Sequence, residues 1–181
     1  MKVTILSSSS NMDNKYIAIA KDVSNVFINY DYDLVFGGSD TSMMGTCYKI
    51  FKENNKEIYA YSNYKYKEYM DKLDCHKIFV DNTFNLKQEL FNSSDILVSL
   101  PGGLGTVSEI LSFIEEKRSN DIDKPFIIYD PYNDYKLLIE LIGYLKEKNF
   151  LNFDLNDYIM IFNNINDLDN YLKESVNKKR I

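Results

Sequence analysis

The chain of 181 residues has no tryptophan, one histidine and two cysteines. Cys47 and Cys75 lack the spacing of a metal-binding pair and are expected to be free thiols. The histidine, His76, is expected to cap a strand rather than to take part in catalysis. The sequence therefore predicts neither a disulfide framework nor a metal site.

Basic residues are too few to balance the acidic ones, and the formal net charge is −6. The acidic excess is spread along the chain, which is typical of a solvated surface. A nucleic-acid backbone attracts positive charge, so nucleic acid is excluded as an expected partner.

Long apolar runs are also missing. No segment approaches the roughly 18 apolar residues that would span a membrane. The N-terminus, MKVTILSSSS, has too short an apolar part for a signal peptide, so we expect a cytoplasmic protein without a membrane partner. Hydrophobic residues make up 45% of the chain, enough for one domain over residues 1–181 with a sizeable core.

The sequence has seven glycines, and three of them lie in the stretch PGGLGTVSE, Pro101 to Glu109. An apolar run, Ile96 to Leu100, precedes it and predicts a buried strand. The segment from Thr106 to Lys117 has the character of a helix. A strand, a glycine turn and a helix start form an anion site, because free N–H groups and the positive helix end face the ligand.

Within this stretch, Gly102, Gly103 and Gly105 would let a ligand approach the backbone closely. Thr106 adds a hydroxyl donor, and Glu109 lies about one turn into the helix, within reach of a bound molecule. The alternative is a tight turn that needs its glycines for packing alone. The stretch is not a Walker A loop, because no Lys-Ser/Thr pair follows, and its spacing is not that of the dinucleotide fingerprint.

A second glycine loop, GGSDTSMMG, begins with Gly37 and Gly38 after a predicted strand and leads into a helix near Thr41. Its methionines, Met43 and Met44, are expected to pack into the core. A serine run, residues 7–10, follows the first predicted strand. It could contact a phosphate or sugar, or it could cap a helix and form a loop, and the sequence favours neither.

The remaining elements alternate between strands and helices. Predicted strands cover Val3–Leu6, Asp33–Phe36, Glu57–Tyr61, Lys77–Val80, Asp95–Leu100, Pro125–Tyr129 and Tyr158–Phe162. Further helices are predicted over Tyr16–Ile28, Phe84–Asn92, Tyr132–Asn149 and Ile165–Ser175, with a frayed basic tail, NKKRI, and a lid or loose helix over Ser62–Leu73. This order predicts an α/β fold, a Rossmann-like three-layer α/β/α arrangement with a mainly parallel sheet of about seven strands. Such sheets bind ligands at the carboxyl ends of the strands, where both glycine loops are expected.

PGGLGTVSE fits the PGGxGTxxE signature of the LOG (LONELY GUY) family, the cytokinin riboside 5'-monophosphate phosphoribohydrolases. GGSDTSMMG resembles the family's GGGxxGLMG loop, and LKQELFNSSDILVSLPGG is similar to its RKxxMxxxSDAFIALPGG segment. The resemblance covers nearly the whole chain. It implies a homodimeric enzyme that needs no cofactor and splits a nucleoside 5'-monophosphate into free base and ribose 5-phosphate.

The resemblance also implies roles for individual residues. Glu109 would be the catalytic acid, assisted by Lys87, and a glutamate near a helix N-terminus is expected to stay ionised. The expected phosphate- and substrate-binding residues are Gly102, Gly103, Leu104, Gly105, Thr106, Gly37, Gly38, Ser8 and Met44.

The chain departs from the family pattern at one catalytic position. The family has an Arg-Lys pair before the signature strand, and the sequence has Leu86 and Lys87 there. Ser39 and Ser42 also stand where the family prefers glycine. The expected result is altered substrate choice, weaker catalysis, or a non-catalytic binder of a nucleotide or phosphorylated cofactor, similar to the molybdenum-cofactor carriers. A dinucleotide-dependent oxidoreductase is disfavoured, because the fingerprint glycines are missing after the first strand.

Overall fold

The computed structural model describes residues 1–10 and 12–179 of the chain. Its sheet contains seven strands, all parallel, in the order β4-β3-β2-β1-β5-β6-β7. The strands are β1 (Lys2–Leu6), β2 (Asp33–Phe36), β3 (Ile58–Asn63), β4 (His76–Val80), β5 (Ile96–Ser99), β6 (Phe126–Tyr129) and β7 (Met160–Phe162). The α-helices are α1 (Asn14–Asn29), α2 (Ser42–Glu53), α3 (Lys67–Met70), α4 (Thr83–Asn92), α5 (Leu104–Arg118), α6 (Lys136–Glu147) and α7 (Ile165–Lys179). None of these helices is long and apolar enough to cross a membrane.

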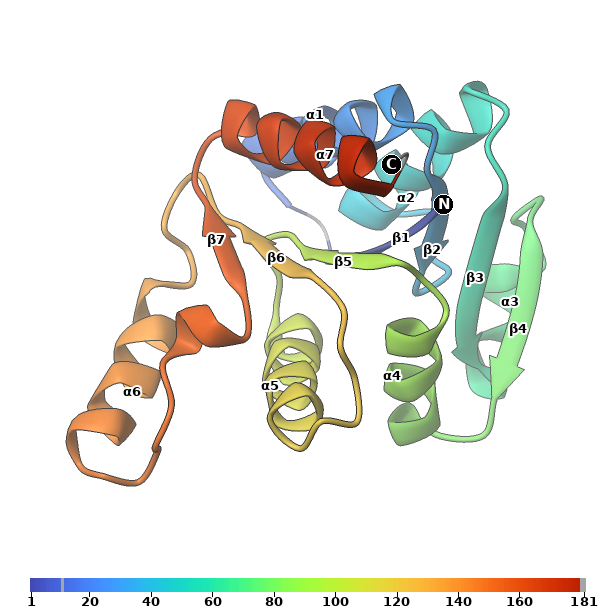
Figure 1. Cartoon of the computed structure of the whole chain (residues 1–181). Helices are drawn as coiled ribbons and strands as arrows, with labels where there is room; N and C mark the ends of the chain where they lie inside the picture. The colour runs from blue at the N-terminus through green and yellow to red at the C-terminus, as the bar shows by residue number, and fades with distance from the viewer. Residues whose placement is uncertain (11, 180–181) are drawn as a thin grey trace.

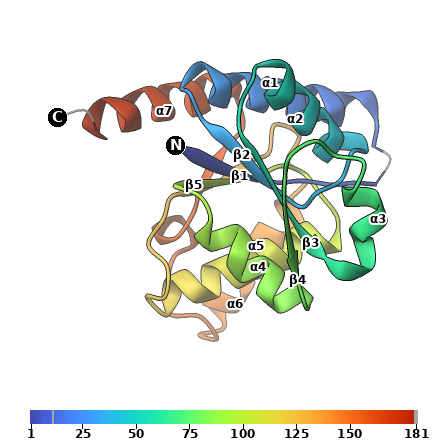
Figure 2. The same cartoon turned by 90° about the vertical axis from the view of Figure 1, so that its right-hand side faces the viewer.

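The helices form two layers around the sheet. In Figure 1, α1, α2 and α7 lie above the sheet, and α4, α5 and α6 lie below it. The view along the sheet in Figure 2 shows the same two layers, with β3 and β4 nearest the viewer and α3 beside them. The predicted Rossmann-like three-layer α/β/α fold is confirmed.

Each face of the sheet packs against its own apolar cluster. On the α1/α2/α7 side, Val3, Phe36 and Val98 belong to one buried cluster. On the α4/α5/α6 side, Leu6 and Leu97 belong to the other. The strands β1, β2 and β5 are therefore buried on both faces, which explains their short and nearly continuous apolar runs.

The strand order reverses between β1 and β5. The two strands pair in parallel to their last residues, with Leu6 opposite Ser99, and the Leu100 N–H donates to the Leu6 carbonyl over 2.8 Å. The serine run after β1 and the signature stretch after β5 therefore start side by side. This reversal is the position where open parallel sheets bind their ligands.

Two predicted segments differ from the observed ones. The helix expected over Tyr132–Asn149 covers only Lys136–Glu147, because the Asp130 carboxylate accepts bonds from the backbone N–H groups that precede it and holds them in a turn. The tail expected to fray from Asn177 is helical through Lys179, and its last two residues lie outside the described residues.

The apolar stripe of α6 is only partly buried. Ile142 is buried, but the side chains of Leu137 and Leu141 are 78% and 52% exposed. The stripe of Leu137, Leu138, Leu141, Ile142 and Leu145 is wider than the face that α6 turns toward the sheet. Amphipathic spacing identified the helix, but it did not indicate how much of the apolar stripe the sheet covers.

Candidate functional site

The signature stretch forms a short turn between β5 and α5. The helix begins at Leu104, two residues earlier than predicted, and Gly103 is its N-cap. The first helical bond runs from the Val107 N–H to the Gly103 carbonyl over 3.0 Å. The N–H groups of Leu104, Gly105 and Thr106 thus lie in the first turn, where a helix offers them no acceptor.

The three glycines of this turn have different surroundings. A β-carbon on Gly102 would overlap the side chain of Thr106, so packing alone requires glycine there. A β-carbon on Gly103 or Gly105 would have no atom of the described residues within 4 Å. Leu104 between them is 86% exposed. Packing therefore accounts for one glycine, and the other two border open space in front of the helix N-terminus.

Glu109 lies farther along the same helix and is half-buried. Burial raises its pKa to about 7, and the nearby charge of Lys87 partly opposes the rise. Glu109 is therefore only partly ionised at neutral pH, and not fully ionised as expected from its place near a helix N-terminus. The favourable effect of a helix N-terminus fades within the first turn, whereas loss of hydration acts directly on the carboxylate.

Lys87 reaches from α4 to α5. Its ammonium group donates to the Ser108 hydroxyl over 2.6 Å and to the Ser112 hydroxyl over 3.0 Å. Ser108 is adjacent to Glu109 in the chain. The sequence-predicted pair, Lys87 and Glu109, is thus brought together on the α4/α5 side of the sheet, close enough for the charge of Lys87 to act on Glu109.

The second glycine loop is packed throughout. A β-carbon on Gly37 would lie 3.2 Å from the Met44 Cε atom, and one on Gly45 would overlap the Asp40 carbonyl. Gly38 has φ +73°, and a β-carbon there would overlap Met70. Met43 is fully buried as predicted, whereas Met44 is only half-buried.

The second loop is joined to the serine run after β1. The Met44 N–H donates to the Ser8 carbonyl over 3.3 Å, and the Thr41 hydroxyl donates to the Ser9 carbonyl over 2.8 Å. The structure therefore brings together Ser8, Gly37 and Met44 of the predicted set. The Leu6–Leu100 bond links this group to the start of the signature turn.

Comparison with known protein families identifies the family of this chain. The family model described as "possible lysine decarboxylase" matches residues 39–172. The chain belongs to this family, the LOG family.

Curated relatives carry the name of one enzyme. Cytokinin riboside 5'-monophosphate phosphoribohydrolase LOG3 of Arabidopsis thaliana is 25% identical over 80% of this chain and 68% of its own length. The cytokinin riboside 5'-monophosphate phosphoribohydrolase of Mycobacterium tuberculosis is 22% identical over 91% of this chain and 89% of its own length.

Solved structures share the fold. The molybdenum cofactor binding protein of Rippkaea orientalis superimposes with a TM-score of 0.72 at 15% identity, covering 97% of this chain and 96% of that one. The Moco carrier protein of Chlamydomonas reinhardtii gives a TM-score of 0.69 at 14% identity and covers 98% of both chains. At these identities the likeness shows the fold alone.

The LOG-type arginine has no substitute among the described residues near Glu109. Leu86, at the arginine position, packs against the apolar cluster on the α4/α5 side. Arg118 lies at the far end of α5 and pairs with Glu115 on the surface. The other arginine, Arg180, lies outside the described residues. The cation that acts on Glu109 is therefore Lys87.

Ser42 also stands at a LOG glycine position, and the backbone there has φ +51°. This is the left-handed region, which glycine adopts freely and other residues adopt at a cost. The Ser42 hydroxyl is buried without a hydrogen-bond partner among the described residues. Ser39 has no such conformation, and its hydroxyl lies 2.9 Å from that of Thr41.

Sequence reasoning missed Tyr135 and Asn63 at the carboxyl edge of the sheet, and it considered Ser7 there only as part of the serine run. Tyr135 donates from its hydroxyl to the Leu100 carbonyl over 2.7 Å. The side-chain oxygens of Ser7 and Asn63 are buried and have no partner among the described residues. Ser7 and Asn63 each stand at the end of a strand, a signal that was available, whereas Tyr135 is more than thirty residues from the turn that it contacts.

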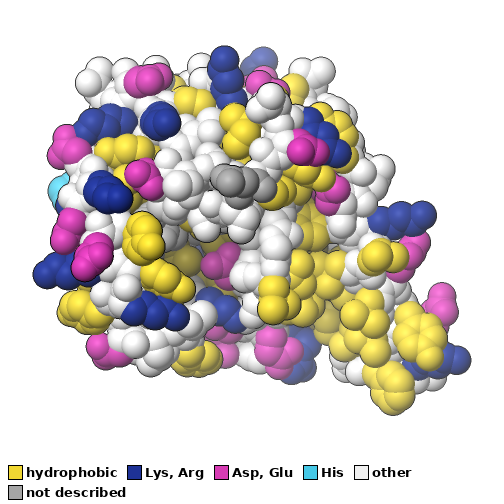
Figure 3. All heavy atoms as spheres, turned by 180° about the vertical axis from the view of Figure 1, so that it is seen from behind, with side chains coloured by type: hydrophobic (Ala, Val, Ile, Leu, Met, Phe, Trp, Pro, Cys, Tyr) yellow, Lys and Arg dark blue, Asp and Glu magenta, His cyan; other side chains and the backbone are white. Residues whose placement is uncertain are grey.

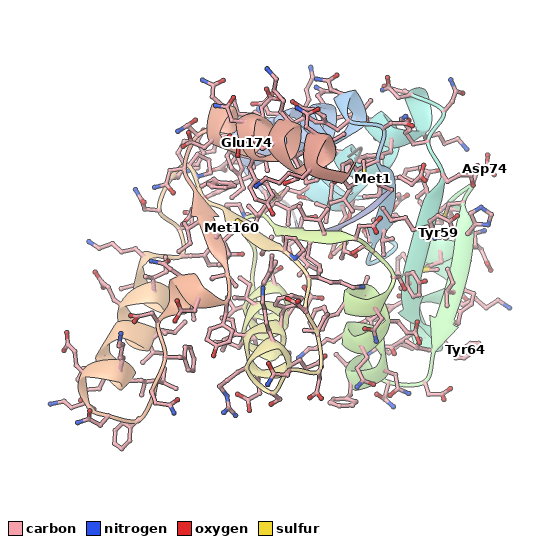
Figure 4. The ribbon with its side chains drawn as sticks, viewed as in Figure 1. Met1, Tyr59, Tyr64, Asp74, Met160 and Glu174 are labelled. Atoms are coloured by element: carbon pink, nitrogen blue, oxygen red, sulfur yellow. The ribbon has the colours of Figure 1, made fainter. Side chains whose placement is uncertain are left out.

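The tyrosines of the segment expected to be a lid lie at the outer edge of the sheet. That segment consists of the end of β3, a short 3-10 turn and the single-turn helix α3. Figure 4 shows Tyr64 at the far end of β3 from Tyr59, beside β4, and the Tyr64 ring stacks on Phe79 with 5.3 Å between ring centroids. Tyr64, Tyr66 and Tyr69 are all exposed.

The rear face of the molecule carries a hollow with an acidic side chain at its centre, as Figure 3 shows. Hydrophobic side chains gather beside it and extend over α6. Leu137, Leu141 and Tyr144 are the exposed large hydrophobic residues of that helix. Among the described residues, no group of three histidine, cysteine, aspartate or glutamate side chains could hold a metal ion.

Proposed function

We propose that the protein is a nucleoside 5'-monophosphate N-glycosidase of the LOG type, which releases the free base and ribose 5-phosphate. One observation carries the proposal. The open turn of Gly103 and Gly105 at a helix N-terminus is followed, along the same helix, by the half-buried carboxyl of Glu109 with a pKa of about 7. The names of the curated relatives support the same reaction.

The open turn suits a phosphate monoester. The first-turn N–H groups of α5 and the hydroxyl of Thr106 would donate to its oxygens, and the positive end of the helix would favour its charge. Glu109 lies five residues beyond Leu104, about 7.5 Å along the helix axis. A ribose attached to the phosphate would extend toward this carboxyl.

Glu109 would act on the ribose during cleavage. Breaking the N-glycosidic bond builds positive charge on the sugar, and an ionised carboxylate stabilises that charge and orients the attacking water. A pKa near 7 leaves a large ionised fraction at neutral pH and also allows the group to carry a proton. The charge of Lys87 raises the ionised fraction, because it lowers the pKa of Glu109.

The test is release of free base from a panel of nucleoside 5'-monophosphates, including AMP, its N6-prenylated form and deoxynucleotides, followed by chromatography. The substitution Glu109→Gln is expected to lower kcat about a hundredfold or more, because it removes the charge and keeps the shape. AMP affinity, measured by calorimetry, should change little. The matched control is Glu115→Gln, an exposed glutamate on the same helix, which should leave kcat unchanged. Equal base release by the Glu109→Gln protein would refute this role for Glu109.

A second candidate is a non-catalytic binder of a nucleotide or phosphorylated cofactor. The apolar Leu86 at the arginine position favours it, since an arginine fork gives two parallel bonds to an oxyanion and a leucine gives none. The names of the similar solved structures point the same way. Thermal stabilisation by nucleotide, without release of base from any member of the panel, would support this candidate over the first.

We also propose that the protein forms a homodimer. On the helices around the signature, Phe91, Phe113 and Ile114 are buried in the core of the single chain, whereas Leu111 is exposed. The exposed apolar side chains of α6 supply a surface that a second copy would cover. A monomeric mass by light scattering at working concentration would count against the dimer.

A further inference from the structure

The turn that leads into the signature stretch is held from two sides. Leu100 donates its N–H to β1, through the Leu6 carbonyl. Its own carbonyl accepts the hydroxyl of Tyr135 over 2.7 Å. The next residue, Pro101, has no N–H to donate. Tyr135 therefore supplies a contact that the sheet does not.

Tyr135 is itself fixed by a buried carboxylate. Asp130, 1% exposed at the end of β6, accepts the backbone N–H of Tyr135 over 2.9 Å and that of Asp134 over 2.8 Å. The Asp130 N–H in turn donates to the Phe162 carbonyl at the end of β7 over 2.9 Å. A continuous chain of bonds thus runs from β7 through Asp130 and Tyr135 to the signature turn.

The hydroxyl of Tyr135 is buried beside the turn, within the electrostatic influence of Glu109. Burial raises its pKa, and the negative charges of Asp130 and Glu109 raise it further. Hydrogen bonds with the Ser99 side chain and the Gly102 backbone lower it, but less than burial raises it. The hydroxyl therefore stays protonated, and it donates to the Leu100 carbonyl at the start of the turn.

We propose that Tyr135 is a positioning residue for the signature turn, whose hydroxyl holds the Leu100 carbonyl at the start of the turn and so directs the first-turn N–H groups of α5 toward a phosphate monoester. The phosphate as ligand rests on the proposed function; the fixing of the turn does not. A tyrosine that served only to fill the core would need its ring and not its hydroxyl.

The substitution Tyr135→Phe separates these roles, because it keeps the ring and removes the hydroxyl. Tyr61→Phe is the matched control, since Tyr61 is also buried and its hydroxyl accepts a bond over 2.8 Å from Ser93, away from the turn. Three quantities are measured in both variants: amide hydrogen exchange at Gly102 and Gly103, which needs no ligand, the affinity for AMP by calorimetry, and base release at saturating AMP.

Tyr135→Phe is expected to speed amide exchange at Gly102 and Gly103 about tenfold relative to Val98 in β5, and to weaken AMP binding by a similar factor. Base release at saturating AMP should change less than threefold, so that KM rises and kcat does not. Tyr61→Phe should leave all three unchanged. If Tyr135→Phe folds poorly, Asp130→Asn should give smaller changes in the same direction.

Two results would overturn the proposal: unchanged exchange at Gly102 and Gly103 in Tyr135→Phe, or faster exchange there with unchanged AMP affinity. Absence of AMP binding by the unaltered protein would instead count against the proposed function. In that case the exchange rates would still decide whether Tyr135 fixes the turn.

Discussion

The two glycine loops of this protein have the same strand–loop–helix arrangement but differ in the surroundings of their glycines. Each follows a strand of the sheet, and each leads into a helix at the carboxyl edge. In the loop after β2, Gly37, Gly38 and Gly45 all face atoms of the chain at close range. In the turn after β5, Gly103 and Gly105 face none within 4 Å.

This difference separates glycines that packing requires from glycines that border open space, where the proposed function places a phosphate. The packed loop uses its glycines to let Met44, Met70 and the Asp40 carbonyl approach the backbone. The open turn keeps its N–H groups accessible, which the fold alone does not require. The helix after the open turn carries a half-buried acid, Glu109, whereas Glu53, the acidic residue of α2, is exposed.

The largest expected effect is on stability, in the packed loop. Gly45→Ala should lower the free energy of unfolding by about 3 kcal/mol, because the new methyl group would overlap the Asp40 carbonyl. The control is Gly143→Ala in α6, where no atom lies within 4 Å and alanine should stabilise the helix by about 0.5–1 kcal/mol. Urea unfolding measures both. Equal stability of the two variants would contradict the close packing of Gly45, on which the contrast between the two loops rests.

The next effect comes from the buried acid beside the open turn. Burial raises the pKa of Glu109 from its ordinary value of 4.5 to about 7. Between these pH values the folded state therefore binds more protons than the unfolded state. Stability should therefore fall by about 3 kcal/mol as pH rises from 4.5 to 7. Glu109→Gln should remove this loss and be the more stable protein at pH 8. The matched control is Glu115→Gln. Because Arg118 lowers the pKa of Glu115, this variant should gain no stability at pH 8.

A smaller effect is expected in the open turn. Gly105→Ala should raise stability by about 0.5–1 kcal/mol, since alanine favours a helix and meets no neighbouring atom. The same methyl group would occupy the space in front of the N–H groups, so AMP affinity should fall about tenfold, or 1.4 kcal/mol. Thermal unfolding and calorimetry give the two values. Unchanged affinity would mean that the open space is not the phosphate site.

The smallest effect is expected at Ser42. Its left-handed backbone suits glycine, so Ser42→Gly should stabilise the protein by about 1 kcal/mol. AMP affinity should stay the same, because the packed loop serves the fold. A loss of stability on this change would show that the serine side chain makes a contact worth more than the strain.

Much of the fold could be predicted from the sequence, because each strand is a short apolar run between polar turns. Strand β2 has the predicted bounds, and β4 begins one residue before its predicted start. The exposure of part of the α6 stripe could not be predicted. Amphipathic spacing shows which face of a helix is apolar, but not how much of that face the sheet covers.

The candidate site could be predicted only where it is local in sequence. The signature turn and Glu109 lie within nine residues, so a strand–turn–helix pattern was enough to find them. The packing of Gly38 against Met70 and the bond from Tyr135 to Leu100 join residues more than thirty positions apart. The pKa of Glu109 depends on burial by the folded chain, which no local pattern gives.

The central claim is that the open turn binds a phosphate and thereby places a ribose beside Glu109. The most direct test compares base release by the unaltered protein from a nucleoside 5'-monophosphate and from the matching nucleoside, at equal concentrations. The account predicts release of base from the monophosphate and little or none from the nucleoside. Equal release from the two would contradict the phosphate site, and no release from any monophosphate would contradict the glycosidase.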